Sequence, residues 1–169
     1  MDTGLSRMTV FIAGYLATGT LPEKLGSATA MNVPHELFPT SDGRVFIAAG
    51  NDRLFARVCE ALGCPKLAGD ERFDTNAKRV ARRSQVHELL AGFTTGITTQ
   101  AAVAALRKAG APCSELNNLS QVLAHEQVQA AEMVMPLPVD RAPQHKAVAL
   151  PLSLNGMRST ARVAPPALG

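Results

Sequence analysis

The turn Gly50-Asn51-Asp52 is the segment of this sequence whose residue types best suit ligand chemistry. It follows a short apolar run, Val45–Ala49, of the kind that forms a buried strand. A strand that passes through a glycine into the start of a helix presents free backbone N–H groups in one direction. Such groups can hold a carbonyl oxygen or an anion. The alternative is an ordinary turn in which Asn51 or Asp52 only caps the following helix.

The cysteine and histidine residues do not have the spacing of a catalytic or metal site. A nucleophilic dyad of Cys113 and His125 is conceivable. However, Cys113 follows a proline in an apolar segment, which favours a small buried thiol. The four histidines lack ligand spacing, so we expect no metal site. The sequence also has no G-x-S-x-G elbow, no P-loop and no G-x-G-x-x-G pattern.

The basic residues do not form the pattern of a nucleic-acid-binding protein. The net charge of +3 is mild, and with six Phe, one Tyr and no Trp the chain offers few aromatic faces for stacking bases. The densest basic run is typical of a solvated helix face with ion pairs; it consists of Lys78, Arg79, Arg82 and Arg83. We therefore expect no nucleic-acid partner.

Length and cysteine usage favour one domain in a reducing compartment. A chain of 169 residues can bury a core, and its three cysteines are an odd count that does not suit a disulfide framework. The most apolar N-terminal stretch, Val10–Leu16, is much shorter than the ~20 residues of a membrane span. We therefore expect a cytoplasmic protein without membrane contact.

The elements around the Gly50 turn are the clearest in the chain. Thr40–Gly43 reads as a tight turn leading into a strand over Arg44–Ala49. After the capping residues, apolar positions from Leu54 to Leu62 recur at helical spacing. Gly63 can then end the helix, and Pro65 blocks its continuation.

The remaining pattern predicts an α/β (α+β) fold, with a small β-sheet flanked by several short helices. The expected elements are an amphipathic helix over Leu5–Ala17, a loop over Thr20–Pro39, a helix from about Ala77 to Phe93 with Val86, Leu89, Leu90 and Phe93 facing inward, a helix over Gln100–Ala109, an extended Ala111–Cys113, a helix from Asn118 or Ser120 toward Met133, and edge strands within Met135–Leu152.

The sequence resembles the small domain of the class III coenzyme A transferases, the formyl-CoA and carnitine-CoA transferase group, which is related to the acyl-CoA racemases. The similarity covers nearly the whole chain. The segments that carry it are Phe38–Gly43, Ala48–Phe55, Cys59, Leu62–Pro65, Asp70–Asn76, Arg79-Val80, Arg83, Ala109–Cys113, Asn117, Gln121-Val122 and Pro165–Gly169.

This resemblance implies a role for the Gly50 turn. In the family a large domain binds CoA and carries an aspartate that attacks the acyl-CoA thioester, while a mobile loop of the small domain closes over the intermediate. The resemblance places Gly50, Asn51 and Asp52 on that loop as substrate-binding residues, and the racemases have an acid at the position of Asp52. Coenzyme A would be a substrate, and no cofactor is implied.

The resemblance also implies what this chain lacks. No aspartate here lies in a segment matching the family's catalytic one, so we predict no catalytic residue and an inactive isolated chain. The expected organisation is a helix and connection over residues 1–22 that would pack on a large domain, a small domain over 23–160, and a tail over 161–169. A large-domain partner or homo-oligomer is expected. The alternative is a non-enzymatic interaction or self-associating module.

One group of signature residues has no evident chemical role. Asp70, Arg72, Arg79 and Arg83 match the family without a catalytic assignment. We interpret them as one ion-pair network that ties the Asp70–Asn76 turn to the helix that follows it.

Overall fold

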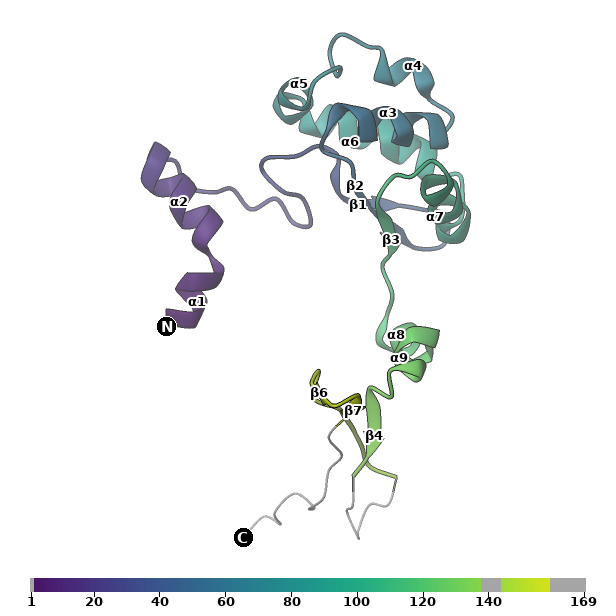
Figure 1. Cartoon of the computed structure of the whole chain (residues 1–169). Helices are drawn as coiled ribbons and strands as arrows, with labels where there is room; N and C mark the ends of the chain where they lie inside the picture. Colours follow the sequence, from purple (N-terminus) through teal and green to yellow (C-terminus); the bar gives the residue numbers. More distant parts are fainter. Residues whose placement is uncertain (1, 138–143, 159–169) are drawn as a thin grey trace. The chain divides into compact units, whose positions relative to one another are not determined.

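The fold around the Gly50 turn is built on an antiparallel sheet of three strands (Figure 1). The computed structural model describes residues 2–137 and 144–158 of the chain. The chain divides into two compact units, Met1–Leu116 and Asn117–Gly169, and the sheet belongs to the first. Its strands are β1 (His35–Pro39), β2 (Arg44–Ala48) and β3 (Cys113–Glu115), in the order β1-β2-β3.

The β1–β2 hairpin is closed by the predicted turn, in which the Thr40 amide donates to the Gly43 carbonyl over 3.0 Å. In the register Phe38 faces Val45, and both side chains are fully buried. The strand expected at Arg44–Ala49 is thereby confirmed. The loop expected over Thr20–Pro39 is wrong in its last part, because β1 occupies His35–Pro39 and alternates buried and half-buried residues there.

Helix α3 (Asp52–Ala61) follows β2 as predicted. Asn51 is its N-cap: the Asn51 Oδ1 accepts from the Leu54 amide over 2.8 Å. Gly63, with φ at +75°, ends the helix in the left-handed conformation that glycine adopts without strain. Helix α4 (Pro65–Ala68) then begins at the proline.

The long helix predicted from about Ala77 to Phe93 is two helices, α5 (Asn76–Ala81) and α6 (Arg83–Thr94). The break falls at Arg82, whose φ of −125° is not helical. Of the four side chains expected to face inward, Val86 and Leu90 are fully buried, as predicted. The prediction is wrong for Leu89 and Phe93, which are 37% and 42% exposed.

Helix α7 (Thr99–Lys108) confirms the expected helix, with Thr98 as its N-cap. The extended exit through Pro112 is also confirmed, since β3 pairs with β2. Helices α3, α6 and α7 pack with the sheet to enclose an aliphatic and phenylalanine core (Figure 1). Its fully buried side chains include Phe38, Val45, Ile47, Phe55, Val58, Phe73, Val86, Leu90 and Leu106.

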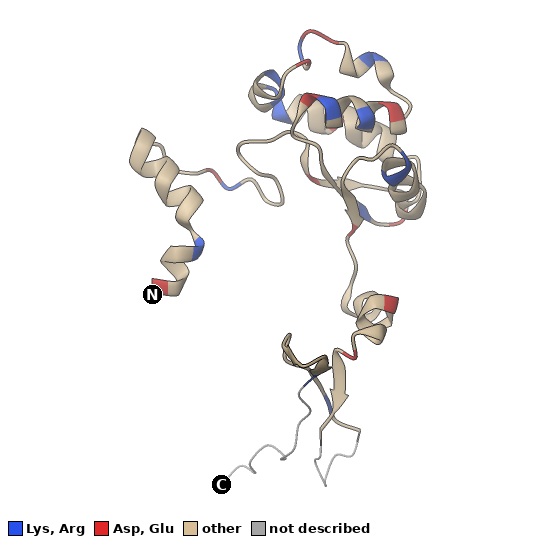
Figure 2. Ribbon diagram, viewed as in Figure 1, with Lys and Arg blue, Asp and Glu red and all other residues tan. Residues whose placement is uncertain are grey.

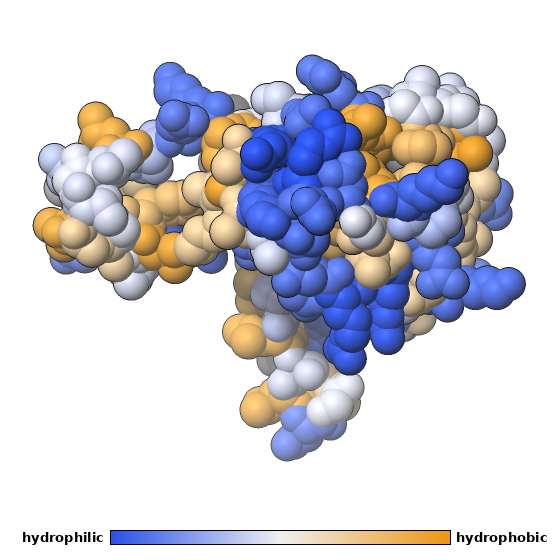
Figure 3. All heavy atoms as spheres, turned by 90° about the horizontal axis from the view of Figure 1, so that it is seen from above, coloured by the Kyte–Doolittle hydropathy of each residue, from blue (hydrophilic) through white to orange (hydrophobic). Residues whose placement is uncertain are grey.

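The N-terminal helix is also divided, into α1 (Asp2–Arg7) and α2 (Thr9–Thr18). Helix α2 carries no charged residue, as its uniform tan colour in Figure 2 shows. Its apolar residues do not gather on one face, so the helix is not amphipathic. None of its residues is buried, and Leu16 is 77% exposed. Apolar residues are accordingly visible on the α1–α2 segment in Figure 3.

The second unit contains short helices and two-stranded sheets. Helices α8 (Leu119–Ala124) and α9 (Glu126–Ala130) replace the single helix expected toward Met133, because His125 has an extended ψ of 133°. Strands β4 (Val134–Pro136) and β5 (Lys146–Val148) confirm edge strands in that region. A second pair is formed by β6 (Ser153–Leu154) and β7 (Met157–Arg158).

The mixed α/β class with small antiparallel sheets is therefore as expected. The division after Leu116 falls inside the domain predicted over 23–160, whose boundaries stay a prediction. The tail predicted over 161–169 lies outside the described residues. Within residues 2–137 and 144–158, no single helix combines the length and apolarity needed to cross a membrane.

The hairpin turn is joined to α7 through Asp42. Its Oδ1 accepts from the Thr99 amide over 2.7 Å and from the Thr99 hydroxyl over 2.8 Å. These two hydrogen bonds lower the pKa of the Asp42 carboxyl below its usual value of 3.8. A carboxyl whose pKa is lowered by folding stabilises the folded state above its unfolded pKa and loses that contribution as the pH falls through the folded one.

Asp42→Ala should therefore lower the urea midpoint at neutral pH, and the difference from the wild-type chain should shrink as the pH falls below 3.8. Asp2→Ala, at the exposed start of α1, is the control and should leave the midpoint unchanged. An Asp42→Ala effect that stays constant from neutral pH into acid would contradict this assignment.

Candidate functional site

The Gly50–Asp52 turn lies where β2 passes into α3, as predicted. The Ala49 amide donates to the Pro34 carbonyl over 2.8 Å, so the chain leaves the sheet beside the Met31–Pro34 segment. Asn51 and Asp52 are exposed and Gly50 is half-buried. The amides of Asp52 and Arg53 have no hydrogen-bond acceptor among the residues that the structure describes, as is usual in a first helical turn.

Gly50 is required here by a close approach of two segments. A Cβ atom at this position would lie 2.5 Å from the Asn32 Cβ and 2.7 Å from its Cγ. Real Cβ atoms essentially never approach a heavy atom so closely. The glycine therefore lets the Met31–Pro34 segment pack directly on the turn.

Arg79 of α5 holds the turn from its buried side. Its side chain is fully buried, and its Nη2 donates to the Gly50 carbonyl over 3.1 Å and to the Asp52 Oδ1 over 2.9 Å. The Nε donates to the Val33 carbonyl over 2.7 Å and the Nη1 to the Phe73 carbonyl over 2.9 Å. One guanidinium thus joins four segments, and a buried cation is tolerable only with such a set of partners.

The Phe55 ring of α3 completes the surroundings of the guanidinium, whose carbon lies 4.4 Å from the ring centroid. The Met31–Pro34 segment has further ties to α5, because the Asn76 Oδ1 accepts from the Val33 amide and its Nδ2 donates to the Met31 carbonyl. The turn, this segment and α5 therefore form one hydrogen-bonded assembly.

The site presents a carboxylate beside unpaired amides. Asp52 is held by Arg79 through Oδ1, but 56% of its side chain remains exposed. Its second oxygen can accept a hydrogen bond from a bound molecule, while the Asp52 and Arg53 amides can donate to an oxygen. This combination can bind a polar ligand.

The predicted four-residue ion-pair network is wrong in its membership. Asp70 forms an ion pair with Arg72, with 2.6 Å between Oδ2 and Nη2. Hydrogen bonds from the Arg72 side chain and amide lower the pKa of the Asp70 carboxyl to about 2. Arg79 pairs with Asp52, and Arg83 donates to the Ala30 carbonyl over 3.0 Å. The sequence places Arg79 on the correct helix but cannot show that its side chain reaches back to the Gly50 turn.

The Cys113 and His125 side chains each have a local partner. The Cys113 thiol donates to the Val103 carbonyl over 3.8 Å, and partial burial raises its pKa. The His125 Nδ1 accepts from the Gln127 amide over 3.1 Å as the N-cap of α9. The expected burial of Cys113 is therefore only partly correct, because its side chain is half-buried.

Sequence reasoning missed a carboxylate–imidazole pair in the first unit. The His87 Nδ1 lies 2.9 Å from the Glu36 Oε2, and the Phe38 ring stacks on the imidazole with 5.0 Å between centroids. Glu36 is only 8% exposed. No spacing signal joins residues on β1 and α6, which are far apart in the chain.

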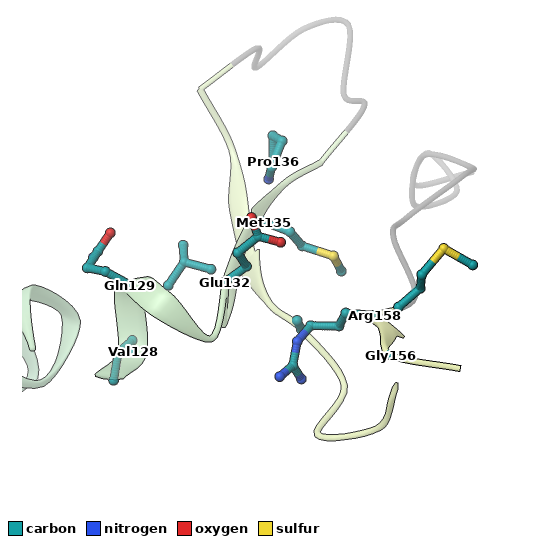
Figure 4. A pocket seen from close by; sticks show the side chains of 10 residues that line it. Val128, Gln129, Glu132, Met135, Pro136, Gly156 and Arg158 are labelled. Carbon is teal, nitrogen blue, oxygen red and sulfur yellow. The ribbon is translucent and has the colours of Figure 1, made fainter. Parts of the chain in front are cut away.

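The second unit has a cavity of about 700 Å³ that includes none of the predicted site residues (Figure 4). Val128 and Met135 form part of its apolar lining, and Glu132 and Arg158 supply its charges. The Arg158 Nη1 donates to the Leu150 carbonyl over 2.7 Å. Within the described ranges, no group of three His, Cys, Asp or Glu side chains is arranged to hold a metal ion.

Comparison with known proteins identifies the family. The model of CoA-transferase family III matches residues 1–169, the whole chain. The chain belongs to CoA-transferase family III. Among its family III relatives, the succinate–glutarate CoA-transferase of Agrobacterium fabrum is 35% identical over 116 residues, which are 69% of this chain and 29% of that enzyme. An acyl-CoA transferase of Fusarium pseudograminearum is 30% identical over 99% of this chain and 37% of its own length.

Solved structures share the fold of this chain. A CaiB/BaiF family protein from Brucella suis superposes with a TM-score of 0.79 at 30% identity, over 95% of this chain and 41% of that protein. A Mycobacterium tuberculosis protein has the same TM-score of 0.79 at 18% identity, which bears on the fold alone. The chain therefore spans between 29% and 43% of the length of these four proteins.

Gly50→Ala should destabilise the first unit by about 1–3 kcal/mol, because the new methyl group cannot fit beside Asn32. In an Asn32→Gly background the same substitution should cost much less, since the conflicting atoms are gone. Gly92→Ala, which adds a methyl into open space, is the matched control. Urea unfolding measures all four variants; equal costs of Gly50→Ala in both backgrounds would exclude the close approach as the cause.

Arg79→Met should destabilise by about 3 kcal/mol or more, because the buried Val33 and Phe73 carbonyls lose their donor. Arg82→Met removes the same charge from an exposed neighbouring position and should change the free energy of unfolding by less than about 0.5 kcal/mol. Chemical denaturation followed by circular dichroism compares the two variants. Equal losses of unfolding free energy in the two variants would show that Arg79 acts only through its charge.

Proposed function

We propose that this chain is the part of a family III CoA-transferase that covers the acyl-CoA thioester during transfer of CoA to a carboxylic acid. The catalytic carboxylate would come from large-domain residues that are not in this sequence. The observation that carries the proposal is the family match along the whole chain, 1–169, combined with a span of 29% of the Agrobacterium enzyme. We infer from the sequence resemblance that the family's catalytic aspartate lies outside these 169 residues.

The Gly50–Asp52 turn would be the covering element. Asp52 and the free amides of the first turn of α3 can form hydrogen bonds with polar groups near the thioester. Because Arg79 ties this turn to α5 and to Val33, the turn would move together with those segments as a rigid cap. Closure of such a cap would exclude water from a reactive acyl intermediate.

The substrate class follows from the relatives. The Agrobacterium protein is a succinate–glutarate CoA-transferase, and a human succinyl-CoA:glutarate CoA-transferase is 31% identical over 73% of this chain. We therefore propose that the CoA donor is the CoA thioester of a short dicarboxylic acid and that the acceptor is a second such acid. Coenzyme A enters and leaves as part of a substrate.

The purified chain, mixed with succinyl-CoA and glutarate, should produce glutaryl-CoA no faster than a protein-free control, because covalent transfer needs the carboxylate nucleophile. Adding a polypeptide that carries the large-domain part of the Agrobacterium enzyme should raise the rate. Liquid chromatography of the CoA esters measures both. Turnover by the chain alone at an enzymatic rate would show that it holds its own nucleophile.

A second role is favoured by α2, whose exposed apolar residues include Val10, Phe11 and Leu16. An apolar helix of this kind tends to be covered by a protein partner, either a large domain or a second copy of this chain. In the second role the chain is an interaction module without catalytic function.

Sedimentation equilibrium of the pure chain distinguishes the two partners. Self-association should appear as a mass that rises with concentration and should be abolished by Leu16→Glu together with Phe11→Glu, which place charges on α2. Glu88→Gln on α6 changes a charge elsewhere and serves as the control. A monomer at every concentration would exclude the self-associating module.

A further inference from the structure

Two cysteines meet where α3 ends. The Gly63 amide donates to the Glu60 carbonyl over 3.1 Å, and the Cys64 amide donates to the Cys59 carbonyl over 2.8 Å. With Gly63 left-handed at φ +75°, these bonds define a Schellman termination. In this motif the residues joined by the outer hydrogen bond also bring their side chains together, and here both are cysteines.

The backbone distance suits a disulfide. The 2.8 Å hydrogen bond between Cys64 N and Cys59 O, with standard bond lengths, keeps the two Cα atoms less than about 6.7 Å apart. Disulfides form across Cα separations of about 4.4–6.8 Å. Both cysteines are free thiols in this structure, Cys59 fully buried and Cys64 7% exposed.

The neighbouring thiols also have different acidities. Interaction with Cys59 lowers the pKa of Cys64, whereas interaction with Cys64, together with burial, raises the pKa of Cys59. The contact thus favours a thiolate on Cys64, the more accessible of the two residues.

A groove gives small molecules access to Cys64. Its volume is about 550 Å³, and besides Cys64 its walls include Leu67, Leu89 and Phe93. Lys66 and Asp70 supply its charged groups. Cys59 does not line the groove, so an oxidant meets Cys64 first.

We propose that Cys59 and Cys64 form a redox-modification site, a dithiol that a hydroperoxide converts into an intrachain disulfide. This proposal goes beyond the proposed transferase function and does not rest on it. It requires the side-chain contact of the Schellman motif, the groove at Cys64 and a hydroperoxide as the oxidant.

The reaction balances in two steps. The Cys64 thiolate attacks one oxygen of hydrogen peroxide, an S–O bond forms, the O–O bond breaks, and the departing hydroxide takes up a proton to give water. Cys59 then loses its proton, and its sulfur attacks the Cys64 sulfur of the sulfenic acid. The S–S bond forms as the S–O bond breaks, and the second oxygen leaves as water. Two thiols and one peroxide thus give one disulfide and two water molecules.

Mass spectrometry can test the site on the full wild-type chain, because trypsin cuts after Arg57 and Lys66 and leaves both cysteines in one peptide, residues 58–66. The folded chain is treated with hydrogen peroxide, and the remaining thiols are alkylated under denaturing conditions. The expected product is peptide 58–66 without alkyl groups and lighter by two hydrogen atoms, restored to the doubly alkylated form by dithiothreitol.

Two controls separate this site from general thiol oxidation. Cys113 has no thiol partner in the described part of the chain, its pKa is raised by burial, and it should remain alkylated at peroxide concentrations that close the pair. The urea-unfolded chain should form the bond more slowly than the folded chain, since unfolding separates the thiols. Two results would overturn the proposal. In the first, peptide 58–66 remains doubly alkylated while Cys113 is oxidised. In the second, the disulfide forms equally fast in the urea-unfolded chain.

Discussion

The buried guanidinium of Arg79 is the interaction on which the first unit depends. It reaches the carbonyls of Val33, Phe73 and Gly50 and the Asp52 carboxylate, so a single side chain joins a loop, a turn and two helices. Burying a cation is unfavourable unless its donors are satisfied, and four donor contacts meet that requirement. This side chain fixes the position of the Gly50 turn as much as the flanking strand β2 and helix α3 do.

That constraint changes how the candidate site should be understood. A glycine-containing loop suggests flexibility, but Gly50 is needed because Asn32 packs against it, and its carbonyl is held by Arg79. The turn is therefore preorganised, with Asp52 oriented before any ligand arrives. In a family III CoA-transferase that closes such a cap over a thioester, the polar groups of the turn would already be aligned. Closure would then cost no further conformational entropy for ordering them.

Local chemistry explains which parts could be predicted from the sequence. The Asn51 cap, the Gly63 termination and the strand before Gly50 depend on near neighbours, and all three are confirmed. The breaks at Arg82 and His125 could not be predicted, because helical periodicity continues through both. Strand β1 was missed because the neighbouring prolines obscured its alternation of buried and half-buried residues. The contact of Arg79 with Asp52 could not be predicted, because no sequence pattern links two residues so far apart in the chain.

Hydrogen–deuterium exchange of the Arg79→Met variant tests the central claim most directly. If Arg79 holds the turn, the amides of Val33 and Ala49 should lose more protection than the hairpin amides of β1 and β2, which lose only what the lower global stability removes. Arg82→Met should exchange like the wild-type chain. Unchanged protection of Val33 and Ala49 in Arg79→Met would show that this guanidinium does not hold the turn in place.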